Sequence, residues 1–200
     1  MVEGNSGKII VLASASPGRK ELLEQLGLKF EVEPSNHTEN VQPKLKPHEL
    51  AKAISREKAL AVAGKHQNVI IIAADTIGVL EGMILGKPKT TEEARKMLSA
   101  LSGKSHSVIT GFTILDTSDN RAASKSVETR VYVKELSPEE IEAYVASGEP
   151  LDKAGAYAVQ GGARAFVRQV CGSYSNVVGL PLPHVKRLLE ILRGSPARSV

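Results

Sequence analysis

Asp75 and Lys87 are the two residues whose positions in this sequence most favour chemistry. Asp75 follows the unbroken apolar run 69–74, and Lys87 stands shortly after it between Gly86 and Pro88. Such a run predicts a strand buried on both faces, here ending at the aspartate. Because an unpaired buried charge is strongly unfavourable, the carboxylate is not there to fill the core. Ligands often bind at strand ends in open α/β sheets, so we expect Asp75 to face a ligand, although it could equally cap the next turn.

A second chemically suggestive stretch follows the first predicted strand, residues 8–14. Ser16 and Pro17 suit the N-cap and first turn of a helix, which Gly27 would end. The free backbone N–H groups and the positive dipole end at such a helix start form a ready anion site. Arg19 opposes that dipole, which indicates a nearby anion; the alternative is a solvated surface arginine.

The elements that must position these residues alternate between strands and helices, which predicts an α/β fold. Helices are expected at residues 48–63, 90–103, 137–148 and 185–192, and the capping box Ser137-Pro138-Glu139-Glu140 marks the start of the third of these. Further strands are expected at residues 30–33, 77–80, 83–85, 107–115, 127–133, 156–159 and 164–170. The strands on either side of Glu81 and Gly82 form a hairpin that would carry Lys87 back beside the end of the Asp75 strand. We expect one domain over residues 8–193, with flexible tails at 1–7 and 194–200.

Composition argues against several classes of protein. The single Cys171 excludes an intramolecular disulfide, and the five scattered histidines disfavour a zinc site. A net charge of +4 fits an anionic ligand but is too mild and dispersed for a nucleic-acid groove. No apolar run is long enough to span a membrane, and the N-terminus lacks a signal-peptide core. We therefore expect a cytoplasmic protein that binds a small anionic molecule.

Bases and acids together suggest one reaction class. Predicted loops, element ends or a polar helix face carry three bases and three carboxylates: Arg19, Lys58 and Lys87, with Glu39, Asp75 and Asp152. The sequence shows no Ser/His/Asp or Cys/His set for nucleophilic catalysis. The mixture suits metal-assisted hydrolysis of a phosphoanhydride, in which carboxylates hold a divalent cation or activate water while Lys and Arg neutralise phosphate oxygens.

Five blocks of the sequence also follow one another in a characteristic order. They are residues 12–23, which include Ser14-Ala15-Ser16-Pro17-Gly18-Arg19, then 74–76 with 86–88, 101–111, 147–157 and 176–181. Together they resemble the Maf (septum formation protein homologue) family from about Ile9 to Leu192. The resemblance implies a nucleoside triphosphate pyrophosphatase of the dTTP/UTP branch. Such hydrolases use a divalent cation, Mg²⁺ or Mn²⁺, to cleave between the α- and β-phosphates.

The resemblance carries expectations about architecture and assembly as well. It implies the inosine-triphosphatase-like fold, in which two α/β lobes surround a long twisted mixed sheet with a central cleft for the substrate. Family members are often dimers, so a homodimer is a further expectation.

The resemblance also implies roles for individual residues. Asp75 would be the proton acceptor that activates water, and it would hold the metal together with Glu39. Ser14 and Arg19 would meet the phosphates at the helix start, and Lys87 would hold them from the opposite side. Asp75, Lys87 and Glu39 are therefore the expected catalytic residues, although Glu39 falls in a variable loop.

Substrate selection is expected to depend on other positions. Lys58 matches a basic site position, although the polar cluster 56–58 is by itself typical of a solvated helix face. Thr76 and Gln160 match positions that tune base selection, and a Gln amide can both donate to and accept from a pyrimidine edge. Gly18 departs from the family pattern, which usually has Arg there, so the base preference is open at this point.

Two alternatives compete with a dTTP/UTP pyrophosphatase. One is a non-catalytic regulator of cell division that binds nucleotides or nucleic acid in the same cleft, for which steeply salt-dependent DNA binding would be the signature. The other is a pyrophosphatase for another base, such as 7-methyl-GTP or ITP, which the same fold would permit.

Overall fold

A computed structural model describes residues 8–35 and 45–194. Its strands are β1 (Ile9–Leu12), β2 (Phe30–Val32), β3 (Val69–Leu80), β4 (Met83–Leu85), β5 (Ser105–Asp116), β6 (Arg121–Val133) and β7 (Val167–Cys171). Its α-helices are α1 (Pro17–Glu24), α2 (Pro47–Ala63), α3 (Thr91–Leu101), α4 (Pro138–Ala146), α5 (Tyr174–Val178) and α6 (Leu182–Gly194). Apart from Gly194, the two predicted tails lie outside the described residues. Within the described part, no helix is long and apolar enough to cross a membrane.

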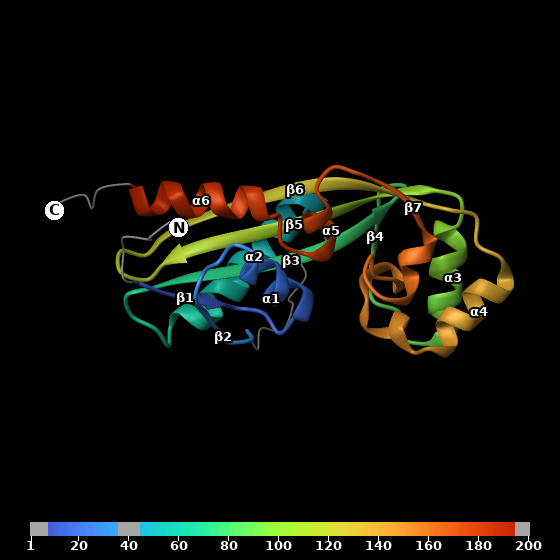
Figure 1. Ribbon diagram of the computed structural model, residues 1–200, viewed down its shortest axis with the longest axis horizontal. Coiled ribbons are helices and arrows are strands. Elements are labelled where there is room, and N and C mark those ends of the chain that lie inside the picture. The colour runs from blue at the N-terminus through green and yellow to red at the C-terminus, as the bar shows by residue number, and fades with distance from the viewer. Residues whose placement is uncertain (1–7, 36–44, 195–200) are drawn as a thin grey trace.

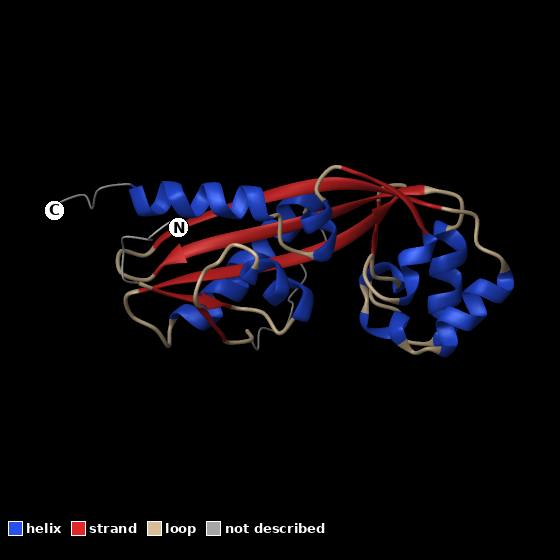
Figure 2. Cartoon of the chain, in the orientation of Figure 1, coloured by secondary structure: helices blue, strands red, loops and turns tan. Residues whose placement is uncertain are grey.

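The strands form one mixed sheet that joins two lobes. The strand order is β2-β1-β3-β5-β6-β7, and β4 pairs with β3. β1 runs parallel to β2 and β3, whereas the other pairs are antiparallel. The long strands β3, β5 and β6 pass between a lobe containing β1, β2, α1, α2 and α6 and a second lobe containing α3 and α4 (Figures 1 and 2). The prediction of an α/β fold with two lobes around a long mixed sheet is confirmed.

Side-chain alternation along β3 gives the first lobe two apolar layers. Ile70 and Ile72 belong to a core with α1 and α6, whereas Ile71 packs against α2 on the opposite face. α2 lies very close to β5 at Gly111, where an added Cβ would stand 2.1 Å from the backbone carbon of Ala51. The short distance between the sheet and α2, the helix that carries Lys58, therefore depends on a position that only glycine fits.

The second lobe covers the far ends of β3 and β6. Leu80 and Val133 from these strands are buried with the apolar faces of α3 and α4. The expected capping box at the start of α4 is present: Ser137 Oγ accepts from Glu140 N, and the Glu140 carboxylate accepts from Ser137 N. These local signals fix where the helices of this lobe begin.

Two predicted strands of the second lobe differ from the structure. Residues 156–159 are not a strand, because Ala156 ends the short 3-10 turn Ala154–Ala156 and the residues after it pair with no other strand. The positive φ angles of Gly155 (74°) and Gly161 (87°) interrupt extended backbone on both sides. The strand predicted from residue 164 begins at Val167, since a further 3-10 turn precedes it.

Of two further predictions, one needs adjustment and one is confirmed. The turn expected at residues 176–179 lies largely within the short helix α5, whose N-cap Ser173 accepts from Asn176 N. The hairpin between β3 and β4 is confirmed, with Gly78 opposite Leu85.

Candidate active site

β3 runs through the candidate site rather than ending at it. The strand continues past Asp75 to Leu80, so the prediction that it stops at the aspartate is wrong. One edge of β3 pairs with β5 from Ile70 to Val79. The other edge pairs with β1 as far as Ile72 and with β4 from Gly78, and in the described residues no strand pairs with the interval between them. Asp75 therefore lies on an unpaired stretch of strand edge at the junction of the lobes.

The Asp75 carboxylate faces α2 and forms an ion pair there. Lys58 Nζ lies 2.6 Å from Asp75 Oδ1, and the two side chains are only 15% and 10% exposed. Low exposure strengthens the attraction between such charges, and it makes the loss of either partner costly. Among the described residues, Asp75 Oδ2 makes no hydrogen bond. One carboxylate oxygen is thus fixed by lysine while the other can accept a proton from a ligand or water.

A second polar group, Ser14, Arg19 and Thr76, lies on the opposite face of the sheet. Arg19 Nη1 donates to Ser14 Oγ at 3.1 Å, Nη2 donates to Thr76 Oγ1 at 3.2 Å, and Nε donates to Gly179 O at 2.9 Å. These contacts tie the guanidinium to β3, to the end of β1 and to the segment after α5. Arg19 belongs to the first turn of α1, whose N-cap is Ser16. The structure therefore places a fixed cation at a helix start, as the sequence predicted.

A chain of hydroxyl groups continues from Thr76 into the core. Thr110 Oγ1 donates to Asn176 O at 2.8 Å and lies 2.9 Å from Thr76 Oγ1. Because Thr110 has one hydroxyl hydrogen, Thr76 must be the donor between the two threonines, which leaves Thr76 Oγ1 to accept from Arg19. Sequence reasoning did not single out Thr110 or Asn176. Their only signal was their place in two of the characteristic blocks, since both side chains are fully buried.

The two polar groups flank the same strand position. Asp75 and Thr76 are consecutive residues of a strand, so their side chains point to opposite faces of the sheet. Only the open edge between β1 and β4 is accessible to both. A ligand lying across this edge could meet the Asp75 and Lys58 pair on one side and Arg19 on the other.

The remaining predicted site residues are not joined to these groups by direct contacts. Lys87 follows β4, is exposed, and makes no hydrogen bond or ion pair within the described residues. Gln160 is exposed as well, and its Oε1 atom lies 3.1 Å from where a Cβ on Gly18 would stand. The Gln160 amide thus reaches the first turn of α1. Glu39 lies outside the described residues.

The carboxylates of the described residues do not form a ready-made metal centre. In residues 8–35 and 45–194, no group of three or more His, Cys, Asp or Glu side chains could hold a metal ion. Mg²⁺, however, is commonly bound by one or two carboxylates together with substrate phosphates. The hard oxygen donors of Asp75 therefore fit a cation that is shared with a triphosphate.

His106 and Tyr157 have a structural arrangement. The Tyr157 hydroxyl lies 2.8 Å from His106 Nε2, and the rings meet edge to face. Burial lowers the pKa of His106 to about 4, so the imidazole is neutral at physiological pH. Asp152 and Lys153 form a neighbouring ion pair at 2.7 Å. The contact with His106 joins Tyr157, three residues before Gln160, to β5.

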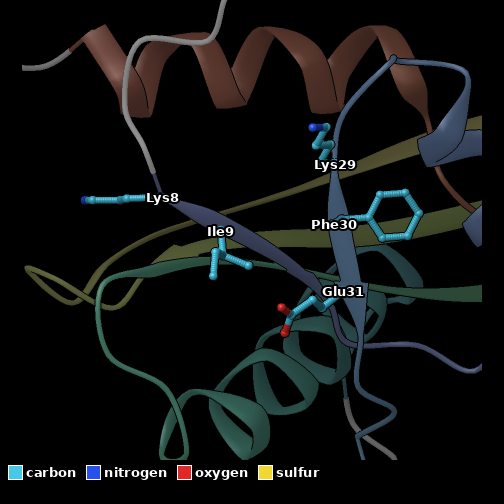
Figure 3. Close-up of a pocket in the computed structure, with 5 residues that line it drawn as sticks. All are labelled: Lys8, Ile9, Lys29, Phe30 and Glu31. Carbon is cyan, nitrogen blue, oxygen red and sulfur yellow. The ribbon is translucent and has the colours of Figure 1, made fainter.

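A cavity of about 290 Å³ lies elsewhere, beside the starts of β1 and β2 (Figure 3). Its lining residues are Lys8, Ile9, Lys29, Phe30 and Glu31, whose side chains point in different directions in Figure 3. Lys8 already pairs with Asp116 at 2.6 Å. Ile9 begins β1 and Ser14 lies beyond the other end of that strand, so roughly 10 Å of strand separates the cavity from the Ser14 end. The cavity is therefore separate from the candidate site.

Comparisons with known proteins point to one family. The family described as "Maf-like protein" matches residues 9–192. The dTTP/UTP pyrophosphatase of Pelotomaculum thermopropionicum is 46% identical over 183 residues, which cover 92% of this chain and 96% of that protein. The dTTP/UTP pyrophosphatase of Methanosarcina barkeri is 49% identical over 182 residues, covering 90% of this chain and 92% of that protein.

A solved structure shows a weaker similarity. The nucleoside-triphosphatase / dITP/XTP pyrophosphatase of Mycobacterium abscessus aligns with 15% identity and a TM-score of 0.38, over 70% of this chain and 93% of that chain. A similarity of this size supports no conclusion about function.

Proposed function

The chain belongs to the family of Maf-like proteins, and from this premise we propose that it is a nucleoside triphosphate pyrophosphatase acting on dTTP and UTP. The observation that carries the proposal is the 46% and 49% identity to dTTP/UTP pyrophosphatases over about nine-tenths of the chain. The reaction would hydrolyse the bond between the α- and β-phosphates and release a nucleoside monophosphate and pyrophosphate. Its cytoplasmic location and its assembly as a homodimer stay predictions.

Asp75 is the proposed general base. Its Oδ2 atom takes a proton from a water molecule, whose oxygen forms a bond to the α-phosphorus. The bond from the α-phosphorus to the bridging oxygen breaks, and pyrophosphate leaves with that electron pair. Lys58 holds the carboxylate through Oδ1, and Oδ2 makes no hydrogen bond to the described residues.

Cationic groups from both lobes bind the phosphates in this proposal. Arg19 is already oriented by Ser14 and Thr76, so little conformational freedom is lost when its guanidinium meets a phosphate. Lys87 approaches from the second lobe. A divalent cation, when bound, neutralises phosphate charge, and the residues that would hold it are Asp75 and, as the sequence predicts, Glu39.

Pyrophosphate release from a panel of triphosphates tests the proposal. The panel contains dTTP, UTP, CTP, GTP, 7-methyl-GTP and ITP, each with Mg²⁺ or Mn²⁺ and with EDTA. We expect metal-dependent turnover that favours dTTP and UTP. Turnover of ITP or 7-methyl-GTP instead would keep the reaction class and change the substrate, whereas no turnover by folded protein would favour a binding regulator.

Asp75→Asn tests the mechanism separately from the substrate. The variant should keep its fold and lose at least ~10³ in turnover, equivalent to about 4 kcal/mol of barrier. Glu142→Gln, which removes an exposed carboxylate of the second lobe, serves as the control and should retain full activity. Substantial turnover by well-folded Asp75→Asn protein would remove Asp75 from the role of base.

A further inference from the structure

Glu149 lies beneath the glycine turn that follows Gln160. Its Oε2 atom accepts a hydrogen bond from Gly162 N at 3.1 Å across thirteen positions of sequence. A Cβ on Gly161 would stand 2.6 Å from Glu149 Oε1, and a Cβ on Gly162 would stand 3.0 Å from Oε2. The turn is therefore wrapped closely around this carboxylate, and its two glycines are the residues that permit the approach.

The backbone of Gly161 confirms how specific this turn is. Its φ of 87° and ψ of −151° belong to a region that is essentially restricted to glycine. The carboxylate also lies near Tyr144, because the position of a Cβ on Gly162 is 3.0 Å from Glu149 Oε2 and 3.3 Å from Tyr144 Cε2. Burial, and after it the Glu149 charge, raises the pKa of that phenol. The backbone of Glu149 is restrained by its own N–H, which donates to Ser147 Oγ at 3.2 Å. The Glu149 carboxylate thus contacts the turn from a backbone position that is itself hydrogen-bonded.

Gln160 projects from this turn towards the other lobe. Its Oε1 atom lies 3.1 Å, and Val178 Cγ1 3.0 Å, from the position of a Cβ on Gly18, at the start of α1. The Gln160 amide makes no hydrogen bond within the described residues, so its donors and acceptor are available to a ligand. The turn that Glu149 supports is therefore what places this amide beside the Arg19 site.

An amide distinguishes pyrimidines only if its orientation is fixed. The edge of thymine or uracil offers an N3–H donor beside an O4 acceptor, whereas cytosine offers an N3 acceptor beside an amino donor. A Gln amide has both an acceptor and donors, so by rotating it could pair with either edge. Discrimination requires that the wrong base leaves polar groups unpaired, which a freely rotating amide would avoid.

We propose that Glu149 is a positioning residue for base selection, which holds the Gly161–Gly162 turn so that Gln160 presents its amide in one orientation. This inference rests on the proposed function and deepens it. The competing explanation is that Glu149 only stabilises the 3-10 turn Gly162–Phe166, because it accepts a hydrogen bond from the first N–H of that turn. The two explanations predict different effects. A purely structural role of Glu149 would change the stability of the protein or its turnover of every nucleotide, but not the ratio of kcat/KM between nucleotides with different bases.

A double-mutant cycle between Glu149 and Gln160 tests the proposal. The measured quantity is the ratio of kcat/KM for dTTP to that for dCTP in the wild-type protein, Glu149→Ala, Gln160→Ala and the double variant. We expect Glu149→Ala to lower this ratio at least about tenfold, because displacements of an ångström at a site have effects of this order or larger. In the Gln160→Ala background the same change should leave the ratio unaltered, since Glu149 acts through Gln160.

Two further variants separate charge and general damage from positioning. Glu149→Gln keeps a side-chain oxygen that can accept from Gly162 N–H, so it should restore most of the discrimination. Glu142→Ala removes an exposed carboxylate of the same lobe and should leave the ratio as in the wild-type protein.

The outcomes distinguish the two proposals. Wild-type protein that hydrolyses no triphosphate would overturn the proposed function and this inference with it. Wild-type protein that prefers dTTP, together with Glu149→Ala protein of unchanged ratio, would overturn the inference alone. The inference alone would also be overturned if the change in the ratio in the double variant were the product of the changes caused by Glu149→Ala and Gln160→Ala.

Discussion

Breaking the ion pair between Lys58 and Asp75 on one side should be one of the costliest single changes in the first lobe. Lys58→Met removes the ammonium group and keeps a side chain of similar length. It leaves the Asp75 side chain, which is 10% exposed, without the partner 2.6 Å away. Breaking a buried pair on one side costs ~3–5 kcal/mol, because the remaining charge is uncompensated. We expect the free energy of unfolding to fall by this amount at neutral pH.

Replacing both partners should reverse most of that loss. Asn at position 75 carries no charge, so the Lys58→Met/Asp75→Asn protein has no isolated carboxylate to bury. Replacing a buried ion pair on both sides is often neutral, and the double variant should therefore be at least ~2 kcal/mol more stable than Lys58→Met alone. Comparing this change with the effect of Asp75→Asn in the wild-type protein completes the double-mutant cycle, which isolates the pair from any other contact that Lys58 makes.

Urea unfolding followed by far-ultraviolet circular dichroism measures these differences, since the chain has no tryptophan to report by fluorescence. The matched control is Lys65→Met, which removes an exposed lysine that pairs with Glu33 at 2.9 Å just beyond the same helix. That pair is exposed to solvent, so its loss should hardly change the urea concentration at the midpoint of unfolding. If Lys58→Met were as mild as Lys65→Met, or if the effects at positions 58 and 75 were additive, the Asp75 site would not depend on this pairing.

Two further predictions concern the packing around the site. Burial lowers the pKa of His106 from 6.5 to about 4. Between these pH values the unfolded chain binds a proton at His106 and the native protein does not. The free energy of unfolding should therefore fall as the pH decreases through this window, by ~3 kcal/mol in total. His106→Phe should lose that part of the pH dependence, and an unchanged slope in urea titrations would contradict the burial argument. Gly111→Ala places a Cβ 2.1 Å from the backbone of Ala51 and should lower the free energy of unfolding by about 3 kcal/mol or more. In the control Gly78→Ala the new Cβ meets its nearest neighbour at 3.4 Å, so this change should be tolerated. Equal thermal stability of the two alanine variants would show that α2 can move away from the sheet.

Local signals in the sequence predicted the elements that carry the site. The apolar run before Asp75, the Ser16 and Pro17 start of α1 and the capping box at Ser137 each depend on a few neighbouring residues, and each is present in the structure. The hairpin after β3 followed from the same kind of pattern. The placement of Ser14 and Arg19 at a strand-to-helix junction was therefore predictable without any tertiary information.

Partners that are distant in the sequence were not predictable in this way. Lys58 looked like part of a solvated helix face, yet its side chain is 15% exposed because α2 lies against Asp75. The continuation of β3 past Asp75 was missed because a carboxylate normally interrupts a buried strand. Here the charge is paired by α2, and the next residue, Thr76, is satisfied by Thr110 and Arg19. Both facts depend on contacts that no local pattern contains.

The unpaired interval of β3 explains why one site can use residues from both faces of a sheet. Asp75 and Thr76 must point in opposite directions as long as β3 is extended, and β3 must be extended because it joins the two lobes. A substrate can contact both only across an open strand edge, and that edge exists because β1 pairs no further than Ile72 and β4 pairs only from Gly78. Lengthening either neighbour by two or three residues would close the edge. The short length of β1 and β4 is therefore as much a requirement of the site as the identity of its charged residues.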